Sequence, residues 1–178
     1  MRPRSLLFLM WKSGGARQNF TEGVLYMKKI SSFTIDHHKL EVGIYLSRID
    51  GDVTTYDLRT RKPYVDEVMD NSTCHTVEHM FATFIRNGEL GDKILYFGPM
   101  GCQTGFYLLV RNTEHRRVLS EIKRVLKEIT EYEGEVFGNS EKECGNCHNL
   151  DLAKAKSLCA AYLEAIFDKT ERDLYYEM

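Results

Sequence analysis

Residues 71–88 read NSTCHTVEHMFATFIRNG, and this stretch decides the fold because it predicts a helix with two different faces. Asn71, Ser72 or Thr73 can cap its start, since their side chains accept hydrogen bonds from backbone N–H groups of the first turn. Gly88 supplies a stop one residue beyond the expected end of the helix.

Residues 75–79 of this helix read H-x-x-E-H. At about 100° per residue, His75 and His79 lie about 40° apart on one face, where they can bind one ion. Glu78 lies about 60° to the other side of His75. The opposite face carries the apolar side chains Val77, Met80, Phe81 and Phe84. We therefore expect one face to pack and the other to coordinate a metal; the alternative is two capping or surface histidines on a solvated helix.

The predicted elements around this helix complete an α+β fold. Two β-rich stretches, 40–49 and 53–60, meet at Asp50-Gly51, which suits a tight hairpin turn between antiparallel strands. Strand-like runs at 93–97 and 105–111 flank a glycine-rich loop that contains Cys102. Two amphipathic helices follow, marked by Leu119, Ile122, Leu126 and Ile129 and by Leu158, Tyr162, Leu163 and Ile166. This order predicts an antiparallel sheet with helices packed on one face.

The composition is that of an ordinary folded protein. The chain has 178 residues, of which 43% are hydrophobic and 28% charged, enough for about one domain with its own core. The formal net charge is −2 and no basic block is present, so we expect no nucleic-acid partner. The longest apolar run, residues 6–11, is far short of the roughly 20 residues that span a bilayer. We expect no membrane span, a cytoplasmic location, and five cysteines that serve as reduced thiols or metal ligands.

Residues 1–26 differ from the remainder, because they show no sustained helical or strand period and end just before a second methionine, Met27. The codons of Glu22 and Gly23 can spell a ribosome-binding sequence at a suitable distance from the Met27 codon. We therefore expect residues 1–26 to be an upstream or non-native extension and residues 27–178 to form a single domain. The rival interpretation is a short membrane-touching arm built on residues 6–11.

A third metal ligand is expected in residues 144–148, which read Cys-Gly-Asn-Cys-His. Two histidines and one cysteine suit Zn²⁺ or Fe²⁺ with one coordination position left open. Gly145 would let the chain turn sharply and aim the Cys144 sulfur at the helix of His75. Cys144 and Cys147 could instead form a separate redox pair or a structural zinc knuckle, although the chain has no second Cys-x-x-Cys.

Five motifs occur in order between Ser32 and Leu163: SFTIDH at 32–37, YDLR at 56–59, HTVEH at 75–79, GPMGCQTGFY at 98–107 and CG at 144–145. Together they resemble S-ribosylhomocysteine lyase, the bacterial autoinducer synthase family often called LuxS. The sequence departs from the family pattern at two positions. Tyr96 stands where many members have an acidic residue, and Tyr64 follows a proline where many have asparagine.

The resemblance implies a homodimer with metal and substrate at the subunit interface and one Fe²⁺, or Zn²⁺, per subunit. It implies cleavage of S-ribosylhomocysteine to homocysteine and 4,5-dihydroxy-2,3-pentanedione, the autoinducer precursor. The residue roles that it implies are His75, His79 and Cys144 as metal ligands, Cys102 and Glu78 as proton carriers, and Ser32, His37 and Arg59 as substrate contacts.

Cleavage of this thioether without a redox cofactor requires the sugar carbonyl to migrate until the sulfur lies β to it, after which the thiol is eliminated. Each step is a proton transfer, so one Lewis-acidic ion and two acid/base groups suffice. Two other function classes stay open. In an inverzincin metallopeptidase, H-x-x-E-H serves zinc proteolysis with a downstream glutamate as third ligand in a much larger chain. A regulatory thiol or metal-binding module would use Cys144, Cys147 and His148 instead.

Overall fold

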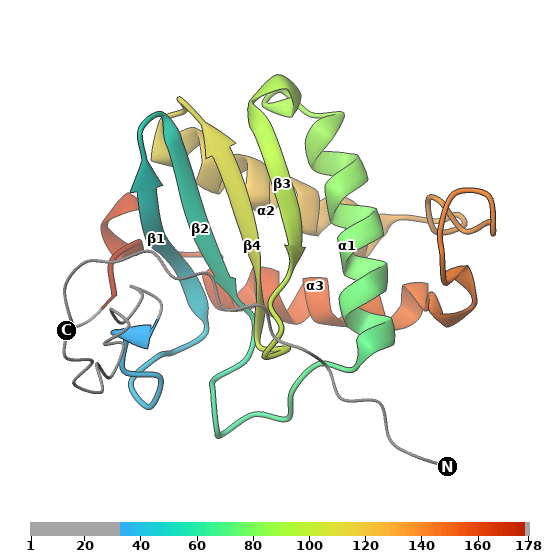
Figure 1. The fold of residues 1–178 in the computed structure, drawn as a ribbon, viewed down its shortest axis with the longest axis horizontal. Helices are drawn as coiled ribbons and strands as arrows, with labels where there is room; N and C mark the ends of the chain where they lie inside the picture. Colours follow the sequence, from blue (N-terminus) through green and yellow to red (C-terminus); the bar gives the residue numbers. More distant parts are fainter. Residues whose placement is uncertain (1–32, 177–178) are drawn as a thin grey trace, which may run out of the picture.

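A computed structural model of the chain describes residues 33–176 and shows the predicted α+β architecture (Figure 1). Ser32 and residues 1–26 lie outside the described residues. One antiparallel sheet has the order β1-β2-β4-β3, with β1 Gly43–Asp50, β2 Val53–Arg59, β3 Ile94–Pro99 and β4 Gly105–Arg111. The helices are α1 Asn71–Arg86, α2 His115–Glu131 and α3 Leu152–Ile166, with 3₁₀ turns η2 Gly91–Lys93, η3 Cys147–Asn149 and η4 Glu171–Asp173.

The β1–β2 hairpin turns where the sequence predicts it. Asp50 pairs with Val53, and the loop between them begins at Gly51 with a φ of +61°, which glycine adopts without a steric penalty. β1 begins at Gly43 rather than at the predicted Leu40, whose side chain is buried ahead of the strand. Leu40 is therefore an apolar residue that packs from a loop, and this is why the sequence pattern predicted the strand to begin too early.

The start of α1 differs from the prediction. Asp70 is the N-cap, and its carboxylate accepts a hydrogen bond from the Thr73 backbone N–H at 2.7 Å. The predicted caps, Asn71 and Ser72 as well as Thr73, all lie inside the helix. A carboxylate is favoured here because it also faces the positive end of the helix dipole. The helix ends at Arg86, with Asn87 as its C-cap.

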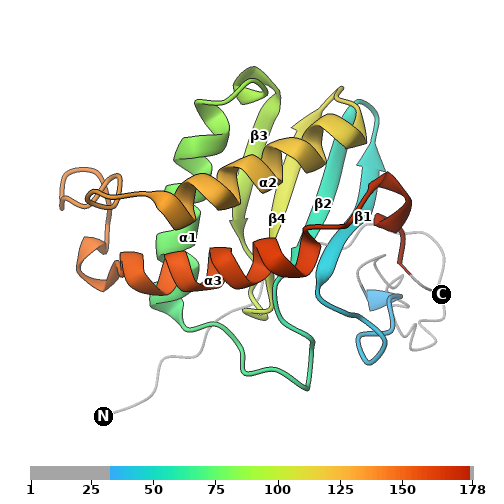
Figure 2. The ribbon, with the colours of Figure 1, turned by 180° about the vertical axis from the view of Figure 1, so that it is seen from behind.

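The helices pack on one face of the sheet, as predicted. α2 and α3 lie across that face, and α1 lies beside β3, where it contacts both other helices (Figure 2). Phe81 of α1 stacks on Phe97 of β3 at 4.1 Å between ring centroids, and Phe97 stacks on Phe106 of β4 at 5.2 Å. All three rings are at most 2% exposed. The apolar stripe of α1 is thereby fixed against the sheet.

The other face of the sheet is not covered by any helix of residues 33–176 (Figure 1). On β3, Ile94 and Phe97 are buried, whereas Leu95 and Tyr96 are 39% and 47% exposed. We call the side of the sheet that carries Leu95 and Tyr96 the open face. None of the helices in residues 33–176 has the length and apolar content needed to span a bilayer.

The aromatic stack should carry much of the stability that orients α1. We expect Phe97→Ala to lower the free energy of unfolding by about 3–5 kcal/mol, because it removes a buried ring and leaves a cavity between α1 and β4. The matched control is Phe167→Ala, since the Phe167 side chain is 68% exposed. Urea unfolding followed by circular dichroism measures both; equal stability of the two variants would contradict the role of the stack.

Candidate active site

Three candidate metal ligands meet beside α1. His75 and His79 stand one turn apart on this helix, and Cys144 comes from the long connection between α2 and α3. One ligand atom from each residue lies within 4.8 Å of the others, and His75 Nε2 is 3.3 Å from Cys144 Sγ. The two imidazole rings stand nearly perpendicular, with centroids 4.6 Å apart. All three side chains are partly exposed, so an ion can reach them.

In each histidine, the ring nitrogen that points away from the ligand group, Nδ1, has a hydrogen-bond acceptor at a fixed place. His75 Nδ1 donates to Asn149 Oδ1 at 2.6 Å, and Asn149 in turn donates to Asn71 Oδ1 at 2.6 Å. His79 Nδ1 donates to the carbonyl oxygen of Phe137 at 2.7 Å. Since Nδ1 carries the proton in both rings, the Nε2 atom of each ring carries the free lone pair that can bind an ion. Such outer contacts fix ring orientation in metal sites.

This arrangement fits a tetrahedral metal ion. Zinc bonds of about 2.0 Å to nitrogen and 2.3 Å to sulfur place the two ligand atoms roughly 3.5 Å apart, close to the 3.3 Å between His75 Nε2 and Cys144 Sγ. The donor set of two imidazoles and one thiolate suits Zn²⁺ or Fe²⁺ equally. The chain therefore has a possible metal site whose residues are those that the sequence predicted.

The connection that carries Cys144 folds around His79. Gly138 has a φ of +68°, and a Cβ at this position would lie 3.2 Å from His79 Nδ1. A turn in which the Cys144 N–H donates to the Ser140 carbonyl at 2.9 Å then brings the sulfur to the site. Gly145 lies in a turn directly after Cys144, as expected, but its φ is not positive; the glycine of this connection that uses a positive φ is Gly138.

Cys147 and His148 do not join the three ligands. Cys147 begins η3, and the His148 side chain is 79% exposed and lies 3.2 Å from Glu141. Cys144 and Cys147 are both free thiols, and it is the grouping of Cys144 with His75 and His79 that favours a metal site over a separate redox pair. Glu78 is half-buried on α1, and within residues 33–176 its carboxylate has no hydrogen bond or ion pair. This leaves the carboxylate available to move protons.

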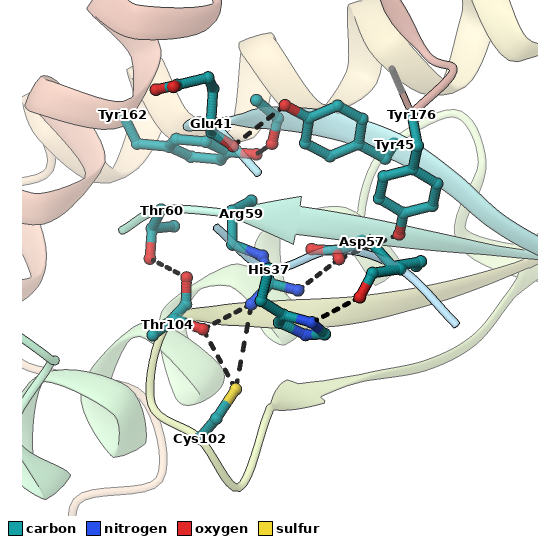
Figure 3. A network of polar contacts seen from close by, with 12 residues as sticks. His37, Glu41, Tyr45, Asp57, Arg59, Thr60, Cys102, Thr104, Tyr162 and Tyr176 are labelled. Atoms are coloured by element: carbon teal, nitrogen blue, oxygen red, sulfur yellow. Dashed lines mark hydrogen bonds and ion pairs between the residues drawn. The ribbon is translucent and has the colours of Figure 1, made fainter. Parts of the chain in front are cut away.

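A second cluster lies at the ends of β2 and β4 (Figure 3). Arg59 Nη2 donates to Asp57 Oδ2 at 2.5 Å, while Nη1 donates to Thr104 Oγ1 and points at Cys102 Sγ, 3.9 Å away. Asp57 and Arg59 are 2% and 3% exposed, whereas Cys102 is exposed. Sequence analysis missed Asp57 and Thr104. The spacing of Asp57 and Arg59, which puts both on one face of a strand, is the signal that could have found the first.

The surroundings of Cys102 favour its thiolate. Desolvation acts to raise the pKa of the thiol, but hydrogen bonds from Thr104 and the positive charge of Arg59 outweigh it, so the pKa lies below its usual value. The Cys102 Sγ to Thr104 Oγ1 distance is 3.1 Å. A thiolate is the form that can accept a proton from carbon, so the cluster supplies a base.

A cavity of about 220 Å³ opens next to this cluster, and its wall includes Cys102, Arg59, Asp57, His37, Tyr107 and Tyr176. Two buried atoms of these side chains, Asp57 Oδ1 and Arg59 Nε, have no hydrogen-bond partner in the described part of the chain. Burial raises the pKa of Asp57, against the opposing charge of Arg59. His37 Nδ1 donates to the Ile35 carbonyl at 3.0 Å, which holds its ring at the cavity. The cavity is thus lined by charged and polar side chains, which suits a polar ligand.

The predicted site residues therefore lie in two clusters rather than one. Within residues 33–176, no hydrogen bond or ion pair joins the metal ligands to the Cys102 cluster. The segment that leads into α1 is linked to the Cys102 loop by a backbone hydrogen bond, in which Met69 N–H donates to the Gln103 carbonyl. The two departures from the family pattern lie outside the cavity wall: Tyr64 is 80% exposed with a φ of +64°, a conformation that asparagine tolerates better, and Tyr96 lies on the open face.

Comparison with known proteins identifies the family. Residues 30–173 match the family described as S-ribosylhomocysteinase (LuxS). The chain belongs to this family. Proteins named S-ribosylhomocysteine lyase are similar to it over 84% of this chain and 99% of their own length: that of Borreliella afzelii (strain PKo) at 45% identity, that of Finegoldia magna at 44% and that of Porphyromonas gingivalis at 42%. The resemblance seen in the five motifs is thus confirmed.

Metal binding should distinguish the two neighbouring cysteines. We expect Cys144→Ala to lose most of its metal, because a three-ligand site loses most of its affinity with one ligand. Cys147→Ala, the matched control, should keep wild-type metal content. Elemental analysis of the purified variants measures both. A metal-free Cys147 variant would show that the ligand assignment is wrong.

Proposed function

We propose that this chain uses a divalent metal at His75, His79 and Cys144 to cleave S-ribosylhomocysteine to homocysteine and 4,5-dihydroxy-2,3-pentanedione. Family membership makes the chain a carbon–sulfur lyase of the S-ribosylhomocysteine lyase type. The observation that carries the proposal is the grouping of two histidines and one cysteine with oriented outer nitrogens, in a chain that also holds an activated thiol. We assign Fe²⁺ as the ion, with Zn²⁺ as the substitute.

The reaction consists of proton transfers that end in elimination. A divalent metal, when bound, supplies Lewis acidity that favours enolisation of the sugar. Removal of the C2 proton and its return to C1 moves the carbonyl from C1 to C2, and a second transfer moves it to C3. Removal of the C4 proton then breaks the C5–S bond, because sulfur lies β to the carbonyl. The electron pair leaves on sulfur, and the resulting enol rearranges to the dione.

Each candidate residue suits one part of this series of reaction steps. The Cys102 thiolate takes protons from carbon and returns them, and Glu78 carries protons for the sugar oxygens and the departing sulfur. Arg59 and His37 face the cavity, where they contact the substrate. Ser32, which lies outside the described residues, keeps its proposed role as a substrate contact. One product, 4,5-dihydroxy-2,3-pentanedione, is an autoinducer precursor and links the enzyme to quorum sensing. The other product, homocysteine, links it to the methionine cycle, in which homocysteine is recycled.

A homodimer with its active site at the interface accounts for the two clusters. The open face leaves Leu95 and Tyr96 exposed, and the Cys102 cavity lies beside Tyr107, whose strand neighbour Gly98 is on β3. A second copy that packs on this face would bury apolar area and could bring its own metal ligands to Cys102. We also propose a cytoplasmic location, where the five free thiols stay reduced.

The geometry gives less support to the two other function classes. An inverzincin needs a carboxylate as the third ligand, whereas the ligand grouped with His75 and His79 in residues 33–176 is the Cys144 thiolate. A regulatory module built on Cys144, Cys147 and His148 would need the three side chains together, but His148 is 79% exposed and pairs with Glu141.

Thiol release from S-ribosylhomocysteine tests the proposed activity. We expect Cys102→Ala and Glu78→Gln each to lower kcat by at least about 100-fold while metal content stays at the wild-type value, because general acid–base groups contribute roughly 10²–10⁴-fold. Glu89→Gln is the matched control, since its side chain is 86% exposed at the far end of α1. Absence of thiol release by the metal-loaded wild type would discard the proposed activity.

The oligomeric state tests the interface. We expect the wild-type chain to sediment as a dimer and Leu95→Asp to sediment as a folded monomer with little activity, because a carboxylate on the open face opposes burial against a second copy. Phe167→Asp, on the other side of the fold and also exposed, is the control. A fully active monomer at assay concentration would contradict the shared site.

A further inference from the structure

The C-terminal segment of the described chain docks against the Cys102 cavity. Leu174, after η4, is 1% exposed, and its carbonyl oxygen accepts a hydrogen bond from Leu46 N–H of β1 at 2.7 Å. The register of β1 shifts between Leu46 and Arg48, so the edge strand is irregular where the segment attaches. Two residues beyond this anchor, Tyr176 forms part of the cavity wall.

Tyr176 is held in a defined position through its ring and through its hydroxyl, which also forms a hydrogen bond with Ser47 (Figure 3). Its hydroxyl donates to Asp57 Oδ2 at 3.1 Å, and its ring stacks on that of Tyr45 at 4.7 Å with an interplanar angle of 12°. Burial raises the pKa of Tyr176, and the negative charge of Asp57 acts in the same direction. The phenol is therefore a neutral hydrogen-bond donor at physiological pH.

The Asp57 oxygen that Tyr176 contacts is the same oxygen that pairs with Arg59 Nη2. The other carboxylate oxygen and Arg59 Nε are buried and unpartnered within the described chain. These two atoms could pair if the carboxylate turned, because a guanidinium readily binds both oxygens of a carboxylate through Nε and one Nη. If the guanidinium followed the turning carboxylate to make this pair, Nη1 would leave its present position beside Thr104 and Cys102.

We propose that Tyr176 is a positioning residue that fixes the Asp57 carboxylate so that Arg59 keeps Nη1 directed at Cys102. The inference rests on the proposed role of Cys102 in proton transfer. Tyr176 lies beyond residues 30–173, the range that matches the family. The groups that face Cys102 from the elements around it are Arg59 and Asp57 of β2, Tyr107 of β4, Cys74 of α1, and His37 and Tyr176 from the flanking segments.

The test compares Tyr176→Phe, which keeps the ring stack and removes the hydroxyl, with Tyr175→Phe as the matched control on an exposed neighbour. The first readout is the pH dependence of iodoacetamide alkylation of Cys102, quantified on its peptide by mass spectrometry. We expect a higher thiol pKa in the Tyr176 variant only. The second readout is kcat, expected to fall about tenfold with KM changed less than about threefold, the size of one hydrogen bond to a charged group.

Tyr176→Leu separates the hydroxyl from the ring. The proposal requires Tyr176→Phe and Tyr176→Leu both to shift the alkylation of Cys102 to higher pH. It is overturned if Tyr176→Phe behaves as wild type, including the case in which Tyr176→Leu alone shifts the profile, which would mark the ring as a packing group only. Alkylation needs no turnover. A wild-type protein that releases no thiol from S-ribosylhomocysteine would therefore refute the proposed function without disturbing this comparison.

Discussion

The rotation of α1 about its own axis determines where the metal site can form. Phe81 stacks on Phe97, and this contact turns the apolar stripe of the helix toward the sheet. Residues on the other stripe must then face outward, because positions on a helix keep their angular spacing. His75 and His79 consequently point at the connection between α2 and α3, which supplies Cys144, the Phe137 carbonyl and η3 with Asn149. A packing contact in the core thus sets the direction of the coordinating face.

The Cys102 cluster is positioned in a different way from the metal site, because it depends on two charged side chains that are buried away from water. Asp57 and Arg59 are almost fully buried, and desolvation of two charges offsets much of the attraction between them. The pair is therefore weak evidence for stability, and we assign it the role of orienting the Arg59 guanidinium. Here it directs Arg59 at an exposed thiol beside a cavity with polar side chains in its wall. The candidate metal ligands and the Cys102 thiol stand on separate elements, so each group is positioned by its own local contacts.

Local patterns in the sequence predicted most of the fold and the two candidate histidine ligands, since they act within a few residues, whereas Cys144 was assigned through the family resemblance. The H-x-x-E-H spacing, the Asp50-Gly51 turn and the periodicity of α2 all belong to this class. Contacts between distant segments were not predictable in the same way. Asn149 reaches His75 across 74 positions, Thr104 reaches Arg59 across 45, and the acceptor for His79 is a backbone carbonyl that any residue could supply. The Asp70 cap was missed because three adjacent polar residues compete for that role on sequence alone.

X-ray absorption at the metal edge of the zinc-loaded protein tests the central claim most directly, because it counts the ligand atoms without requiring turnover. The outward face of α1 together with Cys144 predicts two imidazole nitrogens and one sulfur in the first coordination sphere, with sulfur at about 2.3 Å. A light atom would complete a four-coordinate site. Two sulfur ligands would instead bring Cys147 into the site, and a sphere without sulfur would contradict the role given to Cys144.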